Sequence, residues 1–156
     1  FLGGYLGDRM FQVTHKGRIL VSSVGVILGA VFLTLALKTP AADQTTFFIW
    51  MALTAVFLPL SSPNVVAIVY DVTVPEVRST ANAVEYFMEN IGAAFAPILA
   101  GYLSVHYGKG NAILWVCVAA WLLCFLFYLG ALFTVDKDIH NLRATMAQRA
   151  VGRVPE

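Results

Sequence analysis

Charged residues are scarce in this sequence. They make up 12% of its 156 residues, whereas hydrophobic residues make up 59%. In a soluble domain about a quarter of the residues are charged. The composition therefore excludes an ordinary soluble domain and predicts an integral membrane protein. The sequence also lacks a basic stripe interleaved with aromatic residues, so a nucleic-acid partner is excluded despite the net charge of +1.

Residues that carry catalytic or metal chemistry are few and dispersed. The two cysteines, Cys117 and Cys124, lie two helical turns apart in one apolar segment. Two turns rise roughly 10 Å, which is too far for a disulfide. The three histidines stand singly, without metal-ligand spacing to a cysteine or an acid. We expect no metal and no cofactor, and an integral membrane enzyme is the weakest interpretation because no nucleophile with a base is present.

The apolar residues gather in segments of membrane-spanning length, for which about 20 residues are needed. The sequence predicts an all-α integral membrane fold with four full transmembrane helices and the end of a fifth, Phe1 to Gly7. Residues 1–135 form the bundle, and 136–156 form a tail that is partly an amphipathic helix. The chain starts without an initiator Met or signal-peptide pattern, so we expect it to be a piece of a larger protein. The four spans are expected at about 19–37, 47–70, 80–107 and 111–135.

Basic residues are distributed unequally between the two sides of these spans. The Lys and Arg bias of cytoplasmic loops then predicts that the tail and the loops around residues 8–18 and 71–79 are cytoplasmic. Only Lys38 and Lys109 fall on the other side. The residues on the predicted cytoplasmic side are Arg9, Lys16, Arg18, Arg78, Lys137, Arg143, Arg149 and Arg153.

Two prolines, Pro59 and Pro63, interrupt the second apolar segment. Each removes a backbone donor, and such a break in a membrane is tolerated where neighbours, hydroxyls or water satisfy the freed carbonyls. We expect a kink here, with Ser61 and Asn64 lining a solute path. The alternative is that the serines bond back to their own helix.

The third segment follows a turn at Pro75 and carries Asn82, Glu85 and Glu89 in one column on a helix face. Glu85 is close to the expected helix start, where the helix dipole and the headgroups accommodate an acid. Glu89 is deeper, where a carboxylate facing lipid is costly. Together with Asn90, these acids are candidates for a proton or solute site. An ion pair between Glu89 and a basic residue outside this chain is an equal alternative.

Several motifs resemble those of the major facilitator superfamily. Gly4-Tyr-Leu-Gly-Asp8-Arg9, followed by Gly17-Arg18, resembles its cytoplasmic loop signature, although the longer segment from Met10 to Lys16 separates the two parts. Pro75-Glu-Val-Arg78-Ser-Thr-Ala81 looks like its P-x-x-R-x-T-A element. Asn90-Ile-Gly92, with Pro97 and Gly101, resembles the small-residue helix that follows this element.

The resemblance implies one half of a twelve-helix carrier that works by alternating access. It assigns a gating role to Asp8 and Arg9, within a cytoplasmic charge cluster that also includes Gly4, Arg18, Asp71 and Arg78. The basic tail favours the C-terminal half, from the end of helix 8 through helix 12. The expected partners are a small-molecule solute, the lipid bilayer and the missing N-terminal bundle, and the expected location is the plasma (inner) membrane. The alternative function is a small four-helix membrane scaffold that transports nothing.

Overall fold

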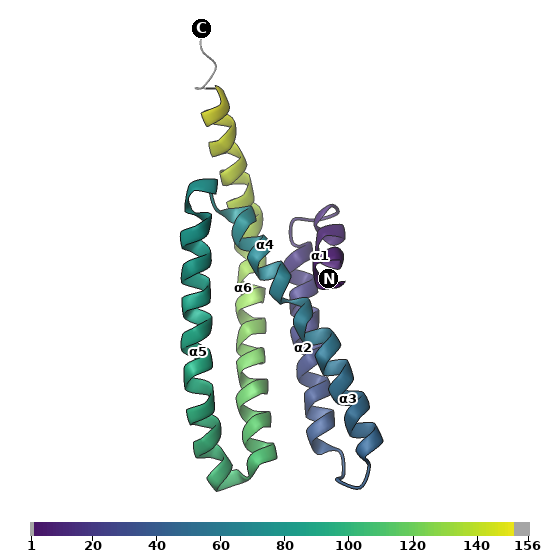
Figure 1. Ribbon diagram of the computed structural model, residues 1–156. Helices are drawn as coiled ribbons and strands as arrows, with labels where there is room; N and C mark the ends of the chain where they lie inside the picture. Colours follow the sequence, from purple (N-terminus) through teal and green to yellow (C-terminus); the bar gives the residue numbers. More distant parts are fainter. Residues whose placement is uncertain (1, 152–156) are drawn as a thin grey trace.

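The computed structural model describes residues 2–151, and all of its regular elements in that range are helices (Figure 1). The predicted all-α fold is confirmed. Short turns join consecutive helices, which run up and down the bundle (Figure 1). The elements are α1 (Leu2–Phe11), α2 (Gly17–Lys38), α3 (Gln44–Phe57), the 3₁₀ turn η1 (Leu58–Leu60), α4 (Ser62–Val72), the 3₁₀ turn η2 (Pro75–Val77), α5 (Arg78–Tyr107) and α6 (Lys109–Val151).

Helix α2 is the centre of the bundle, because it packs against α1, α3, α4 and α6. Small residues let other backbones approach it closely. A Cβ added to Gly25 would lie 2.8 Å from the carbonyl oxygen of Phe57, so a larger residue does not fit without a shift. At one end of α2, Ile19 forms a fully buried cluster with Val135 and Ile139 of α6.

The predicted break between Pro59 and Pro63 is confirmed. Helix α3 ends at Phe57, the chain makes the short turn η1, and α4 begins at Ser62. The Ser61 hydroxyl donates to the Leu58 carbonyl at 3.2 Å, so it satisfies one backbone acceptor beside the break. This back-bonding is the alternative foreseen for the serines.

Three helical stretches are long and apolar enough to cross a membrane, Gly17–Lys38, Gln44–Val72 and Lys109–Ala150. Three of the four predicted spans are thus supported. Helix α5 is not among these three within the described range. Its 30 residues still rise about 45 Å, enough for the roughly 30 Å hydrocarbon core, so the fourth span stays a prediction.

Helix α6 continues without a break past residue 135, where the tail was expected to begin. It runs for 43 residues, about 65 Å, and extends beyond the other helices at its C-terminal end (Figure 1). Its residues up to Ile139 still pack on α2. The last part of the expected tail, 152–156, with Arg153, lies outside the described residues.

The connections alternate between two ends of the bundle. The α1–α2 loop, the α4–α5 junction and the C-terminal part of α6 lie at one end, and the α2–α3 and α5–α6 turns lie at the other (Figure 1). We call the first the basic end, because Arg9, Lys16, Arg18, Arg78 and Lys137 belong to its segments. Lys38 and Lys109 belong to the opposite end, as the sequence predicted.

Candidate functional site

Arg18 joins the ends of three helices at the basic end. Its Nη2 donates to Oδ1 of Asp8 at 2.7 Å, and its Nη1 donates to Oδ2 of Asp71. Its guanidinium carbon lies 4.3 Å from the ring centroid of Phe11, within the range of a cation–π contact. The Arg18 side chain is 15% exposed, and that of Asp71 is 22% exposed. We call Asp8, Arg18 and Asp71 the Arg18 cluster.

A glycine immediately before Arg18 allows this arrangement. A Cβ added to Gly17 would lie 2.4 Å from the carbonyl carbon of Met10, so only glycine permits the start of α2 to lie against the end of α1. The tight α1–α2 connection returns Arg18 to the face of α1 that carries Asp8. Arg18 therefore reaches Asp8 across only 10 positions of the sequence.

Asn64 holds α4 against α1 about two helical turns before Asp71. It is 1% exposed, and its Nδ2 donates to the carbonyl oxygens of Gly3 at 3.0 Å and Leu60 at 2.8 Å. A Cβ added to Gly7 would lie 1.8 Å from Asn64 Oδ1, so Gly7 must lack a side chain for Asn64 to fit. Because Asp8 and Asp71 follow on the same two helices, this contact sets the register in which both carboxylates meet Arg18.

The other residues expected in the charge cluster make different contacts. Arg9 is exposed and donates to the Tyr5 hydroxyl at 3.1 Å. Arg78 donates to the Tyr70 carbonyl at 3.0 Å, with its guanidinium 5.3 Å from the Tyr70 ring centroid. Gly4 faces Pro63 at an ordinary contact distance. The structure thus brings Asp8, Arg18 and Asp71 together, and places Arg9 and Arg78 beside tyrosines.

The polar column of α5 begins next to Tyr70. Asn82 Nδ2 donates to the Tyr70 hydroxyl at 2.8 Å. Glu85 is half-buried, and its Oε2 is covered without a hydrogen-bond partner in the described structure. Glu89 and Asn90 are exposed, and the Asn90 amide donates to the Tyr86 carbonyl at 2.6 Å. The described residues therefore cover part of Glu85 and leave Glu89 and Asn90 exposed.

Of the two candidates near the proline break, Ser61 is half-buried and Asn64 is enclosed. Asn64 binds the backbone of α1 and η1, and this contact needs no solute. The role of these residues in a solute path stays a prediction.

Two further sets of ion pairs at the basic end were not foreseen. Asp136 of α6 pairs with Lys16 at 3.2 Å and approaches His15 Nδ1 at 3.7 Å. Arg149, near the end of α6, donates to Glu76 Oε1 at 3.0 Å. Charge spacing alone does not show that these segments meet, because the contacts depend on α6 remaining one continuous helix. Together these ion pairs attach the C-terminal part of α6 to the α1–α2 loop and to the α4–α5 junction.

A comparison of the sequence with models of protein families identifies the family of this chain. The model of the Major Facilitator Superfamily matches residues 1–153. The chain belongs to the Major Facilitator Superfamily. It is therefore an integral membrane protein of the secondary-transporter class, as predicted, and the match favours the carrier over the four-helix scaffold. No solved structure matches the chain.

Among residues 2–151, no group of three or more His, Cys, Asp and Glu side chains is placed to hold a metal ion. The functional groups that remain are the Arg18 cluster at the basic end and the acidic face of α5.

Proposed function

We propose that this chain is the C-terminal half of a carrier that moves a small solute by alternating access, with its solute site shared with the missing N-terminal bundle. The basic end is the cytoplasmic side of a plasma (inner) membrane, because it holds most of the Lys and Arg residues. The helical architecture and the family match support the general assignment to the secondary transporters.

The observation that carries the proposal is that one guanidinium holds the ends of α1, α2 and α4. The Arg18 cluster is neither fully buried nor fully exposed. Ion pairs of this intermediate kind stabilise an arrangement without making it permanent, because water can replace the lost partner. We assign the gating role to this cluster. In it, the positively charged Arg18 side chain donates hydrogen bonds to the carboxylates of Asp8 and Asp71. Asp8 keeps its expected role, whereas Arg9 is directed to Tyr5.

Proton coupling is the second part of the proposal, and it rests on Glu89. Eleven residues separate Glu89 from the start of α5 at Arg78, a rise of about 16 Å, or roughly half of a 30 Å hydrocarbon core. A carboxylate at that depth is too costly to face lipid and should face water or protein. We propose that Glu89 faces the crevice between the two bundles, with Glu85 and Asn90 on the same helix and Ser61 and Asn64 elsewhere on the same half.

The experiment is uptake of a panel of labelled solutes into vesicles that contain the full-length carrier, with and without a pH gradient. Glu89→Gln should abolish the stimulation by the gradient, because the amide carries no titratable proton. Asp138→Asn, at an exposed position of the α6 extension, is the control and should leave the stimulation unchanged. Unchanged stimulation in Glu89→Gln would show that Glu89 is structural.

A further inference from the structure

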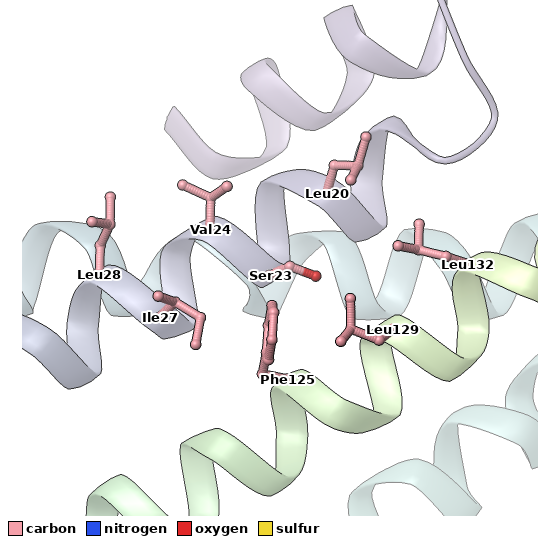
Figure 2. Close-up of a pocket in the computed structure, with 8 residues that line it drawn as sticks. All are labelled: Leu20, Ser23, Val24, Ile27, Leu28, Phe125, Leu129 and Leu132. Carbon is pink, nitrogen blue, oxygen red and sulfur yellow. The ribbon is translucent and has the colours of Figure 1, made fainter.

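An apolar groove runs along the seam between α2 and α6. Its first part encloses about 440 Å³ between the two helices, and a second hollow of about 250 Å³ continues it toward the opposite end. Both parts include Ile27, so they form one groove. In Figure 2, side chains of α6 project toward α2 across the first part. The first part is lined by Leu20, Ser23, Val24, Ile27, Leu28, Phe125, Leu129 and Leu132.

The groove offers no free hydrogen-bond donor to an occupant. Its polar lining residues are Ser23 and Thr34, and the proton of each hydroxyl is already donated to a backbone carbonyl. Ser23 donates to the Ile19 carbonyl at 2.8 Å, and Thr34 donates to the Ala30 carbonyl at 2.7 Å. A polar solute would lose its hydration here and gain no partner. The occupant must therefore be a hydrocarbon.

The groove is long enough to hold an extended acyl chain within one half of a bilayer. The lining residues of α2 extend from Leu20 to Leu35, a rise of about 22 Å, compared with roughly 15 Å for half of the hydrocarbon core. Both walls belong to helices that are apolar enough to cross a membrane. Leu20, Val24 and Leu129 remain exposed, so the walls themselves do not close the groove.

A charged pair stands at the mouth of the groove. Lys16 precedes Leu20 by one helical turn, and Asp136 follows Leu132 by one turn. Their side chains pair across the seam at 3.2 Å, and that of Lys16 stays 40% exposed. An ammonium group carries three N–H donors, so Lys16 keeps donors for an anionic oxygen after it pairs with Asp136. The mouth lies at the basic end, where the ends of the apolar helices predict the lipid headgroups.

We propose that the α2–α6 groove binds a membrane phospholipid, with one acyl chain along the seam and its phosphate on Lys16. The lipid occupies a defined site and is distinct from the bulk lipid around the helices. This proposal depends on membrane insertion and is independent of the solute, the gate and the proton coupling proposed above.

The test uses the full-length carrier in nanodiscs that contain a phosphatidylcholine with a diazirine on one acyl chain. After photolysis, mass spectrometry of peptides locates the adducts. We expect adducts on the groove residues within 20–35 and 118–132 to exceed those on Phe133, an exposed residue of α6 outside the groove, severalfold. Equal labelling of all exposed faces would mean bulk lipid only. An unlabelled groove would mean that another helix of the carrier covers it, and either result overturns the proposal.

Matched variants separate the site from general contact with lipid. Val24→Phe narrows the groove and should reduce its adducts severalfold, whereas Val105→Phe, at an exposed position of α5, should leave them unchanged. Lys16→Gln should also reduce the adducts, unlike Lys38→Gln at the other end of α2. Adducts that persist in Val24→Phe would overturn the acyl-chain site, and adducts that persist in Lys16→Gln would overturn the phosphate contact.

Discussion

Arg18 and Asp71 are joined by a hydrogen-bonded ion pair across 53 positions of the sequence. The same guanidinium binds Asp8 through its other terminal nitrogen. One side chain of α2 thereby fixes the ends of α1 and α4 at the basic end. The geometry uses two separate N–H groups in a fixed plane, which only arginine provides.

Arg18→Lys is expected to weaken the basic end even though it keeps the charge. A lysine ammonium is a point charge and does not reproduce the planar fork that reaches both carboxylates. We expect a loss of about 1–3 kcal/mol, below the roughly 3–5 kcal/mol for breaking a fully buried pair, because the cluster retains access to water. Thermal unfolding of the purified carrier measures this loss. Arg9→Lys is the control, and an equal loss in that variant would contradict the assignment to Arg18.

Gly7→Ala is expected to destabilise the α1–α4 contact by about 1–3 kcal/mol, as overpacking usually does. Its methyl group would overlap the Asn64 side chain, since the ideal Cβ lies 1.8 Å from Oδ1. Gly4→Ala on the same helix should have little effect, because its Cβ would be 3.7 Å from Pro63. Denaturant unfolding compares the two variants.

A double-mutant cycle tests whether Gly7 and Asn64 act as a pair. Asn64→Ala alone removes the hydrogen bond to Gly3, which in a membrane is worth about 0.6 kcal/mol on average and up to about 1.7. In that background the overlap is gone, so Gly7→Ala should cost less than it does in the parent protein. Strict additivity of the two changes would contradict the contact.

Asp43 at the opposite end gives a pH-dependent prediction. It is the N-cap of α3. Hydrogen bonds from Thr46 lower the pKa of Asp43 below its ordinary value of 3.8, and the Thr46 side chain contributes more to this shift than the Thr46 backbone amide. A carboxylate whose pKa is lowered by folding stabilises the helix start above its unfolded pKa. That stabilisation is lost as the pH falls through the folded pKa. It is therefore complete near neutral pH and disappears in acid, below about pH 3.8.

Carbon NMR of the Asp43 carboxyl during a pH titration measures this effect. Thr46→Val should return the pKa of Asp43 part of the way toward 3.8, since the backbone donor remains at 3.1 Å. Thr45→Val, at the neighbouring exposed threonine, should not move it. A pKa of Asp43 that is the same in both variants would contradict the contribution of the Thr46 hydroxyl.

Much of the fold could be predicted from the sequence, because apolar length and proline punctuation determine it. The spans at 19–37 and 47–70 correspond to α2 and to α3 with α4, and Pro59 and Pro63 mark the break between them. The continuity of α6 was missed, although residues 131–151 contain neither Gly nor Pro. Position 135 marks the end of the apolar run and does not mark the end of the helix.

The candidate site was predicted less completely, because tertiary contacts decide it. The motif pointed to Asp8 and Arg9, but the direction of each side chain depends on the approach of α2 to Met10 at Gly17. Asn64 appeared as a polar residue beside a break, and its partner at Gly3 lies 61 positions away. Gly3 and Gly7, four residues apart, were the available signal that another helix would lie against α1.

The most direct test of the account measures access to position 89 from each side of the membrane. In the full-length carrier with Cys117 and Cys124 replaced by serine, Glu89→Cys is treated with a membrane-impermeant maleimide, with Arg18 intact or as Arg18→Gln. Releasing the cluster should speed the reaction severalfold from the basic-end side and slow it from the other, whereas Lys38→Gln should change neither rate. Identical rates with and without Arg18, or no reaction from either side, would contradict a gated, water-filled crevice at Glu89.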